Sequence, residues 1–471
     1  MKKLFLSIAS ILAAGSMYAN NIVVSNVSLS GRDQTNDYTL VNADVAWSNS
    51  WRTSTNESNW DGAWIFVKYR KVRTTVWNHA TINYSAAGAT AAGHSEPAGA
   101  TIKSSPDGKG AFLFRSGNGI GNVNFTSAKI RWNYGIDGVK DNDSVEVRVF
   151  AMEMVYVPSG PFYLGSGSTE QMTFKDGNTA NPYLVADANE ISVENVPGSL
   201  YYGTRLSEDR LGPIPSTYPT GFNSFWLMKY EASQQQYADF INHLDLNKAT
   251  ARNIGIFTGA HPSFVAPNPE RVCGSVSYAD LLAYADWTGM RPFTELEFEK
   301  ACRGSNMTPV ADEYAWGNTT IVNVTTVSST GTANEAPIAF ANSNNAPTGA
   351  ALKRTGLFAT ANASRDTAGA TYYGVMEMTG SVWEMVVPVS NPTARQFLAS
   401  KHGSGNLDAN GDSPTWNGVG NAIYSIRGGA INSGLVYGRV SDAYYRNYGA
   451  YYGYLTTRNI GYGIRVARTG N

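Results

Sequence analysis

The sequence has little charge, and the charge that it has is balanced. Lys and Arg number 36 against 37 for Asp and Glu, and the four charged residue types make up 15% of the 471 residues. Nucleic acids and anionic membrane surfaces attract proteins with a basic excess, which this chain does not have. We therefore expect no nucleic-acid partner.

Cysteine is scarce as well, with only Cys273 and Cys302 in the whole chain. In an oxidising compartment the pair could form one disulfide that closes a loop of about 30 residues, which would stabilise the fold by roughly 3 kcal/mol. Two buried free thiols are the alternative, because a sequence does not show whether two Cα atoms lie within bridging distance.

Long apolar runs are confined to the N-terminus. The first residues, "MKKLFLSIASILAAGSMYAN", place two lysines before an apolar run and small residues, which predicts a secretory signal peptide over residues 1–19. No later stretch approaches the ~20 apolar residues that a membrane helix needs, so we expect no transmembrane segment. No cysteine follows the apolar run, so a lipid anchor is not indicated. The mature protein is expected to be secreted, periplasmic or on the cell surface.

Common catalytic motifs are missing too. The sequence contains no G-x-S-x-G, no H-E-x-x-H and no phosphate-binding glycine loop. A single HxE occurs, at His94, and no HxxxH spacing occurs among the five histidines: His79, His94, His243, His261 and His402. The sequence therefore offers no common catalytic motif that would predict an enzyme.

Two regions with different patterns follow the signal peptide. Residues 20–150 contain short β-prone runs, such as "YTLVNADVAWS" and "GAWIFVKYRKV", between turn residues, which predicts an all-β sandwich. Residues 152–471 add helices with capping-box starts at Ser277 and Thr294, and another helix that begins after Ser233. The rest of this region is rich in Gly and Asn and is typical of loops and short strands. The predicted fold class is α+β.

Six motifs together resemble one known family. In chain order they are "FWLMKYEASQQQYADFI", "VSYADLLAYADWTGMRPFTELEFEKACRG", "YAWGN", "YGVMEMTGSVWEM", "SIRGGA" and "GYGIRVAR". They are similar in order and form to motifs of the sulfatase-modifying-factor family, the formylglycine-generating enzymes, over residues 154–468. The resemblance implies a C-type-lectin-like fold with long loops, preceded here by a β domain of a kind that often precedes such domains in exported bacterial proteins.

The resemblance also implies a chemistry that this chain lacks residues for. Enzymes of the family oxidise a substrate cysteine with oxygen and a copper ion held by two cysteine thiolates, and soft sulfur ligands suit Cu(I). Residue by residue, those positions are Ser433 and Gly438 here, and the family's catalytic serine corresponds to Ala430. We therefore expect neither copper nor a catalytic residue at these positions.

A structural calcium ion is the second implication of the resemblance. The family binds calcium through a loop that matches "EMTGSVWE", which assigns the side chain of Glu377, the carbonyl groups of Gly380 and Val382, and the carboxylate of Glu384. Such hard oxygen ligands suit Ca²⁺. A tight turn with Trp383 in the core is the alternative.

The stretch from Ser425 to Arg468 is rich in tyrosine, serine, glycine and asparagine, the composition of antibody combining loops. In lectin-like domains it would form the ligand face, and we assign Arg427 and Arg465 at its ends to buried hydrogen bonding and Tyr462 to the core. The predicted contact residues are Asn432, Tyr437, Tyr444, Tyr445, Arg446, Asn447, Tyr448, Tyr451, Tyr452, Tyr454 and Asn459.

The layout of this stretch also resembles the variable proteins of diversity-generating retroelements. The sequence thus predicts an exported, non-catalytic member of the family that binds a protein or glycan. An oxidoreductase of the family with an altered active site, and a structural component of the cell surface, are the alternatives.

Overall fold

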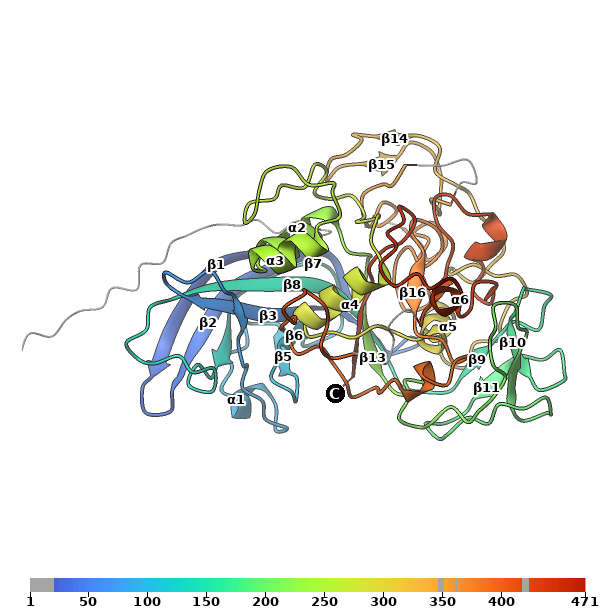
Figure 1. Ribbon diagram of the computed structural model, residues 1–471, viewed down its shortest axis with the longest axis horizontal. Helices are drawn as coiled ribbons and strands as arrows, with labels where there is room; N and C mark the ends of the chain where they lie inside the picture. Colours follow the sequence, from blue (N-terminus) through green and yellow to red (C-terminus); the bar gives the residue numbers. More distant parts are fainter. Residues whose placement is uncertain (1–20, 346–350, 361–362, 417–422, 471) are drawn as a thin grey trace, which may run out of the picture.

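The computed structural model describes residues 21–345, 351–360, 363–416 and 423–470 (Figure 1). The predicted signal peptide, residues 1–19, lies outside this range. None of the helices in the described part of the chain has the length and apolar character needed to cross a membrane.

Two sheets pack face to face in the N-terminal part. The smaller sheet has the order β1-β2-β7 (Val23–Asp33, Tyr38–Arg52 and Gly119–Trp132), and its strands are antiparallel. Residues along β2 alternate between buried and half-buried, as expected of a strand with one face on a core. Val41, Val45 and Trp47 point into the core that β2 shares with the second sheet. The two sheets thus enclose one apolar core in this part of the chain.

The second sheet joins this part to the rest of the chain. Its order is β18-β13-β8-β3-β6-β5, and β4 pairs with β3. These strands span, in that order, Ala467–Thr469, Phe225–Met228, Val145–Val157, Asp61–Lys71, Ala111–Arg115 and Ala100–Ser104, with β4 at Asn78–His79. Strand β8 runs through the predicted domain boundary at residues 150–152, so the sheet does not divide there.

Strand β3 is buried on both faces because the sheet has neighbours on both sides. Ala63, Ile65 and Val67 face the smaller sheet, whereas Trp64 and Phe66 belong to the core beneath the helices. The Phe66 ring meets Trp287 of α4 edge-on, with centroids 5.2 Å apart.

The three predicted helices are confirmed, each with a capping box. They are α2 (Gln234–Asn242), α4 (Tyr278–Trp287) and α5 (Glu295–Arg303), which begin after Ser233, Ser277 and Thr294. Three short helices were not predicted: α1 (Ala89–Ala92), α3 (Leu246–Arg252) and α6 (Tyr448–Tyr452). Two 3₁₀ turns, η1 (Ala394–Gln396) and η2 (Leu435–Gly438), also occur.

The remaining strands form small two-stranded ribbons within long loops, in keeping with an α+β fold. The antiparallel pairs are β9 (Phe162–Leu164) with β11 (Tyr183–Val185), β10 (Phe174–Asp176) with β12 (Leu200–Tyr202), β14 (Val327–Ser328) with β15 (Ala336–Pro337), and β16 (Glu384–Val386) with β17 (Ser425–Arg427).

The two cysteines are buried free thiols. Cys273 packs in the core beneath α2 and α4, and Cys302 packs in a separate apolar cluster with Phe298 and Tyr314. The disulfide is therefore not formed, and the alternative of two free thiols is confirmed.

Candidate functional site

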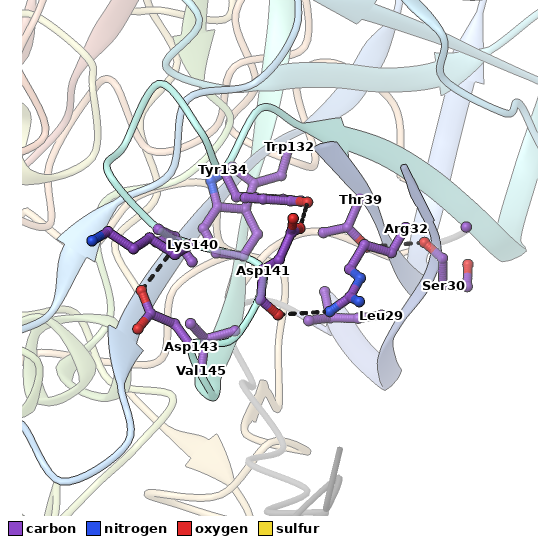
Figure 2. A pocket seen from close by; sticks show the side chains of 12 residues that line it. Leu29, Ser30, Arg32, Thr39, Trp132, Tyr134, Lys140, Asp141, Asp143 and Val145 are labelled. Carbon is purple, nitrogen blue, oxygen red and sulfur yellow. Dashed lines mark hydrogen bonds between the residues drawn. The ribbon is translucent and has the colours of Figure 1, made fainter. Parts of the chain in front are cut away.

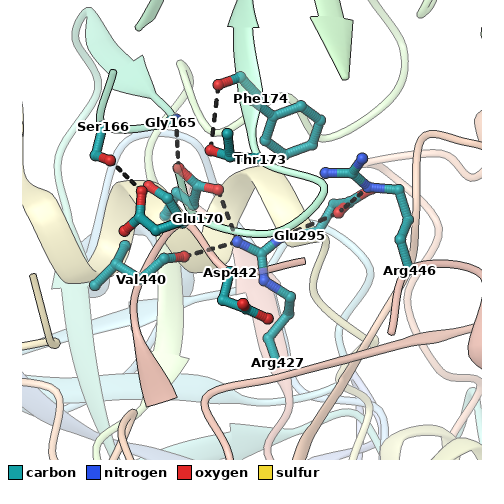
Figure 3. Close-up of polar contacts among 12 residues, drawn as sticks. Gly165, Ser166, Glu170, Thr173, Phe174, Glu295, Arg427, Val440, Asp442 and Arg446 are labelled. Carbon is teal, nitrogen blue, oxygen red and sulfur yellow. Dashed lines mark hydrogen bonds and ion pairs between the residues drawn. The ribbon is translucent and has the colours of Figure 1, made fainter. Parts of the chain in front are cut away.

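Buried ion pairs hold both ends of the tyrosine-rich segment. Arg427 donates to Glu295 at 3.1 Å and to Glu299 at 2.7 Å, and both carboxylates belong to α5 (Figure 3). Arg465 donates through Nε to Glu384 at 2.7 Å. Both arginines are fully buried, which confirms that they serve internal hydrogen bonds.

Arg446 and Asn447 belong to the same buried layer. The Nε of Arg446 donates to Glu295 at 3.0 Å, and its guanidinium lies 4.2 Å from the centroid of the Phe174 ring. Asn447 is buried at the start of α6, and its side-chain amide donates to the carbonyl of Leu206 at 3.2 Å. The prediction that these two residues contact a ligand is therefore wrong, because both side chains are buried in the fold.

The tyrosines form a continuous cluster of rings. The Tyr445 ring meets the Trp383 ring edge-on, with centroids 5.5 Å apart. The centroids of the Tyr437 and Tyr448 rings each lie 5.3 Å from that of Tyr445. Tyr462 is buried in the core, as predicted. In contrast, Tyr437, Tyr445 and Tyr448 are only partly buried, so each keeps part of its ring at the surface.

A cavity of about 210 Å³ opens among these rings. Its lining is Trp383, Ile426, Asn432, Ser433, Gly434, Tyr437, Tyr445, Tyr448, Asn459 and Tyr462. Of the predicted contact residues, the lining includes Asn432, Tyr437, Tyr445, Tyr448 and Asn459. The structure therefore brings these five together around one opening.

The other predicted tyrosines lie outside the cavity lining. Tyr451 and Tyr452 on α6 are 51% and 39% exposed. Tyr452 stacks on Tyr454 with centroids 5.2 Å apart, and Tyr444 meets Tyr445 at 4.9 Å. These four rings extend the aromatic surface away from the cavity.

A loop that was not predicted, residues 203–210, flanks this surface. The guanidinium of Arg205 lies 3.8 Å from the centroid of the Tyr444 ring and 5.5 Å from that of Tyr445. The Glu208 carboxylate accepts hydrogen bonds from the backbone N–H groups of Arg205 and Leu206, which shapes the turn. No local pattern predicts this contact, because the loop precedes the tyrosines by more than 200 residues.

A family model, the sulfatase-modifying factor enzyme 1-like domain, matches residues 141–470. The chain belongs to this family. The match begins just before β8, the strand that links the N-terminal sandwich to the rest of the fold. No curated protein matches the sequence.

Ser433 and Gly438, the positions at which the family resemblance implies copper-binding cysteines, both lie next to Gly429. A Cβ placed on Gly429 would lie 3.0 Å from Ser433 Oγ and 3.2 Å from the backbone nitrogen of Gly438. Ser433 Oγ accepts from the Ala430 N–H at 2.8 Å, so this hydroxyl closes a local turn. The hydroxyl and the glycine hydrogen offer no soft ligand for Cu(I).

The predicted calcium loop places two carboxyl groups next to each other. Glu377 accepts from the Leu357 N–H at 3.1 Å through one oxygen, and its other oxygen is buried beside the Glu231 side chain. Glu384 is instead bound by Arg465. Burial and the nearby Glu377 carboxylate raise the pKa of the neighbouring Glu231 well above its usual range.

Within the described ranges, no group of three or more His, Cys, Asp and Glu side chains could hold a metal ion. Glu384 would have to leave Arg465 to reach a cation. The calcium site, with the Gly380 and Val382 carbonyl groups, stays a prediction.

Two further buried carboxyl groups, those of Glu170 and Asp442, lie near Arg427 (Figure 3). Burial raises the pKa of Glu170 to about 7 and that of Asp442 to about 6. Ser166 donates to Glu170, and Asp442 accepts from the backbone N–H of Tyr444 at 3.1 Å. The neighbouring Ala443 N–H donates to the carbonyl of Gln171 at 2.9 Å, so this loop supports the backbone beneath the aromatic surface.

A second cavity, of about 180 Å³, lies at one end of the β-sandwich (Figure 2). Leu29, Trp132 and Tyr134 are among its lining residues. The Tyr134 hydroxyl donates to Asp141 at 2.6 Å, and Arg32 donates to the Asp141 carbonyl at 3.0 Å. Because these polar groups bind each other, they are not free to recognise a ligand.

Proposed function

We propose that this family member is an exported, non-catalytic protein that binds a protein or glycan ligand through the tyrosine-rich surface. The cavity among Tyr437, Tyr445 and Tyr448 is the observation that carries the proposal. Ser433, which lines this cavity, occupies a position at which the family resemblance implies a copper ligand.

The chemistry of the surface supports binding. Tyrosine offers a large, rigid and amphipathic contact area with little loss of side-chain entropy, and asparagine adds adaptable hydrogen bonds. Asn432 and Asn459 are exposed at the cavity, and Tyr451 and Tyr452 continue the aromatic surface beyond it. A partly open cavity next to exposed rings suits recognition of a group that projects from a larger molecule.

The state of the cysteines argues against oxidase chemistry. The thiolate is the form that binds metals, and burial raises the pKa of both the Cys273 and the Cys302 thiol above the usual range. Neither residue lines the cavity. The chain therefore supplies no thiolate pair next to Ser433.

Two assays test the proposal. In the first, a copper titration with a cysteine-containing peptide is followed by oxygen uptake, and we expect no copper-dependent uptake. Uptake that follows the copper concentration would show that an altered oxidase site is present and would contradict the non-catalytic proposal.

In the second assay, the protein is applied to arrays of oligosaccharides and of peptides. We expect wild-type protein to bind and the Tyr451→Ala/Tyr452→Ala variant to bind weakly, because these rings are exposed at the proposed contact surface. Tyr84→Ala is the matched control, since Tyr84 is 41% exposed in the N-terminal part. Equal loss in the control, or no loss in the double variant, would contradict a role for this surface.

A further inference from the structure

An arginine without an acidic partner stands beside the cavity. Arg205 is exposed, and its guanidinium carbon lies 3.8 Å from the centroid of the Tyr444 ring. It is also 5.5 Å from the centroid of Tyr445, a ring that lines the cavity. Stacking on an aromatic ring orients a guanidinium and leaves its N–H edge free for another acceptor.

Within residues 21–345, 351–360, 363–416 and 423–470, no ion pair or side-chain hydrogen bond engages the Arg205 guanidinium. Its neighbour Arg210 differs, because that guanidinium donates to the Tyr201 hydroxyl at 2.7 Å and to Thr204 at 2.9 Å. Both arginines are exposed and lie near tyrosine rings. They therefore differ in whether their N–H groups are already occupied.

Three carboxylates of the same loop and of the segment beside Tyr444 do not pair with Arg205. Glu208 is buried and accepts from backbone N–H groups of its own turn through one oxygen, and Asp209 is bound by Arg395 at 2.6 Å. Asp442 is buried and accepts from the Tyr444 N–H. The cavity lining itself contains no acidic residue. Arg205 therefore adds a positive charge beside the cavity, and no residue of the described ranges forms an ion pair with it.

The lining favours a hydroxyl-rich ring over an apolar side chain. Pockets that anchor a partner's side chain are predominantly apolar. Here the side-chain amides of Asn432 and Asn459 and the Ser433 hydroxyl stand among the tyrosine rings. Ring faces next to hydrogen-bonding amides match a sugar, which has apolar C–H faces and a polar edge of hydroxyl groups.

We propose that the cavity binds an acidic oligosaccharide and that Arg205 binds the carboxylate of a uronate residue. This inference rests on the proposed ligand-binding function and specifies its ligand class. A guanidinium can donate two parallel hydrogen bonds to one carboxylate, which makes arginine selective for such groups.

The test uses oligogalacturonate and glucuronate-containing oligosaccharides, each with its carboxyl-reduced counterpart, measured by calorimetry against the full-length protein. We expect wild-type protein to prefer the acidic form by roughly ten- to a hundred-fold, the range that a charge-assisted hydrogen bond provides. Arg205→Ala should lose this preference, and Arg210→Ala should keep it. Equal melting temperatures of the variants would show that the loss is not a folding defect.

The outcomes separate this inference from the proposed function. If wild-type protein binds acidic and carboxyl-reduced sugars equally, the role of Arg205 is refuted while glycan binding stands. If it binds acidic peptides and no sugar, the ligand class is wrong but the contact surface remains. If it binds neither, both proposals fail. Equal loss of preference in Arg205→Ala and Arg210→Ala would also refute a specific role for Arg205.

Discussion

Arg446 offers a quantitative test of which part of the tyrosine-rich segment is structural. Its guanidinium is fully buried, pairs with Glu295 at 3.0 Å and lies over the rings of Phe174 and Tyr202 at 4.2 and 4.5 Å. Removing one partner of a buried ion pair costs about 3–5 kcal/mol, because a charge is left buried. Glu295 retains its ion pair with Arg427 after the change. We therefore expect Arg446→Ala to lower the free energy of unfolding by about 3 kcal/mol, the low end of that range.

Urea unfolding of the full-length protein at neutral pH measures this loss. Tyr451→Ala is the comparison, because a substitution at an exposed site away from the core changes stability by about 0.5 kcal/mol or less. Arg446→Met keeps the apolar stem and removes the charge, which separates packing from the ion pair. If Arg446→Ala retained wild-type stability and lost ligand binding, Arg446 would be a contact residue and the assignment to the buried layer would be wrong.

Three further predictions follow from the same region. Burial raises the pKa of Glu170 to about 7, so the folded state keeps this proton, and the stability that it contributes is present at acidic pH and lost as pH rises through 7. Glu170→Gln should therefore raise stability near pH 8, by up to about 3 kcal/mol, and leave it nearly unchanged near pH 4, measured by urea unfolding at both pH values. Ser433→Cys/Gly438→Cys should gain Cu(I) binding in a competition titration, because both positions lie next to Gly429 in space. Ser433→Cys alone is the control, and a double variant that binds Cu(I) no more tightly than this control would contradict the alignment of these positions. Tyr451→Ala/Tyr452→Ala should keep the wild-type melting temperature in calorimetry, and a large drop would place these rings in the core.

Local features of this fold could be predicted from the sequence, whereas distant contacts could not. The capping boxes at Ser277 and Thr294 depend on residues three positions apart, and both predicted helices are confirmed. The burial of Arg446 depends on Glu295, which lies 151 residues away in α5. Composition alone grouped this arginine with the exposed tyrosines. The residues around an arginine in the sequence do not show whether a distant carboxylate pairs with it in the fold.

The site was predicted in part for the same reason. Asn432, Tyr437 and Tyr445 lie at one cavity because the arginines at both ends of the segment are fixed to the core, which the family resemblance implied. The approach of Arg205 to Tyr444 could not be predicted, since it arises where two loops far apart in sequence meet. The continuous sheet through β8 was missed because a change of sequence pattern near residue 150 does not end the strand.

The most direct measurement of the central claim is the affinity of a cavity-blocking variant for the strongest-binding molecule on the oligosaccharide and peptide arrays. Asn432 is exposed and lines the cavity, so Asn432→Trp would fill the opening without disturbing the core. We expect this variant to lose binding at an unchanged melting temperature, with Tyr84→Ala as the control that keeps it. Wild-type affinity in Asn432→Trp would show that the ligand binds elsewhere and would contradict the account.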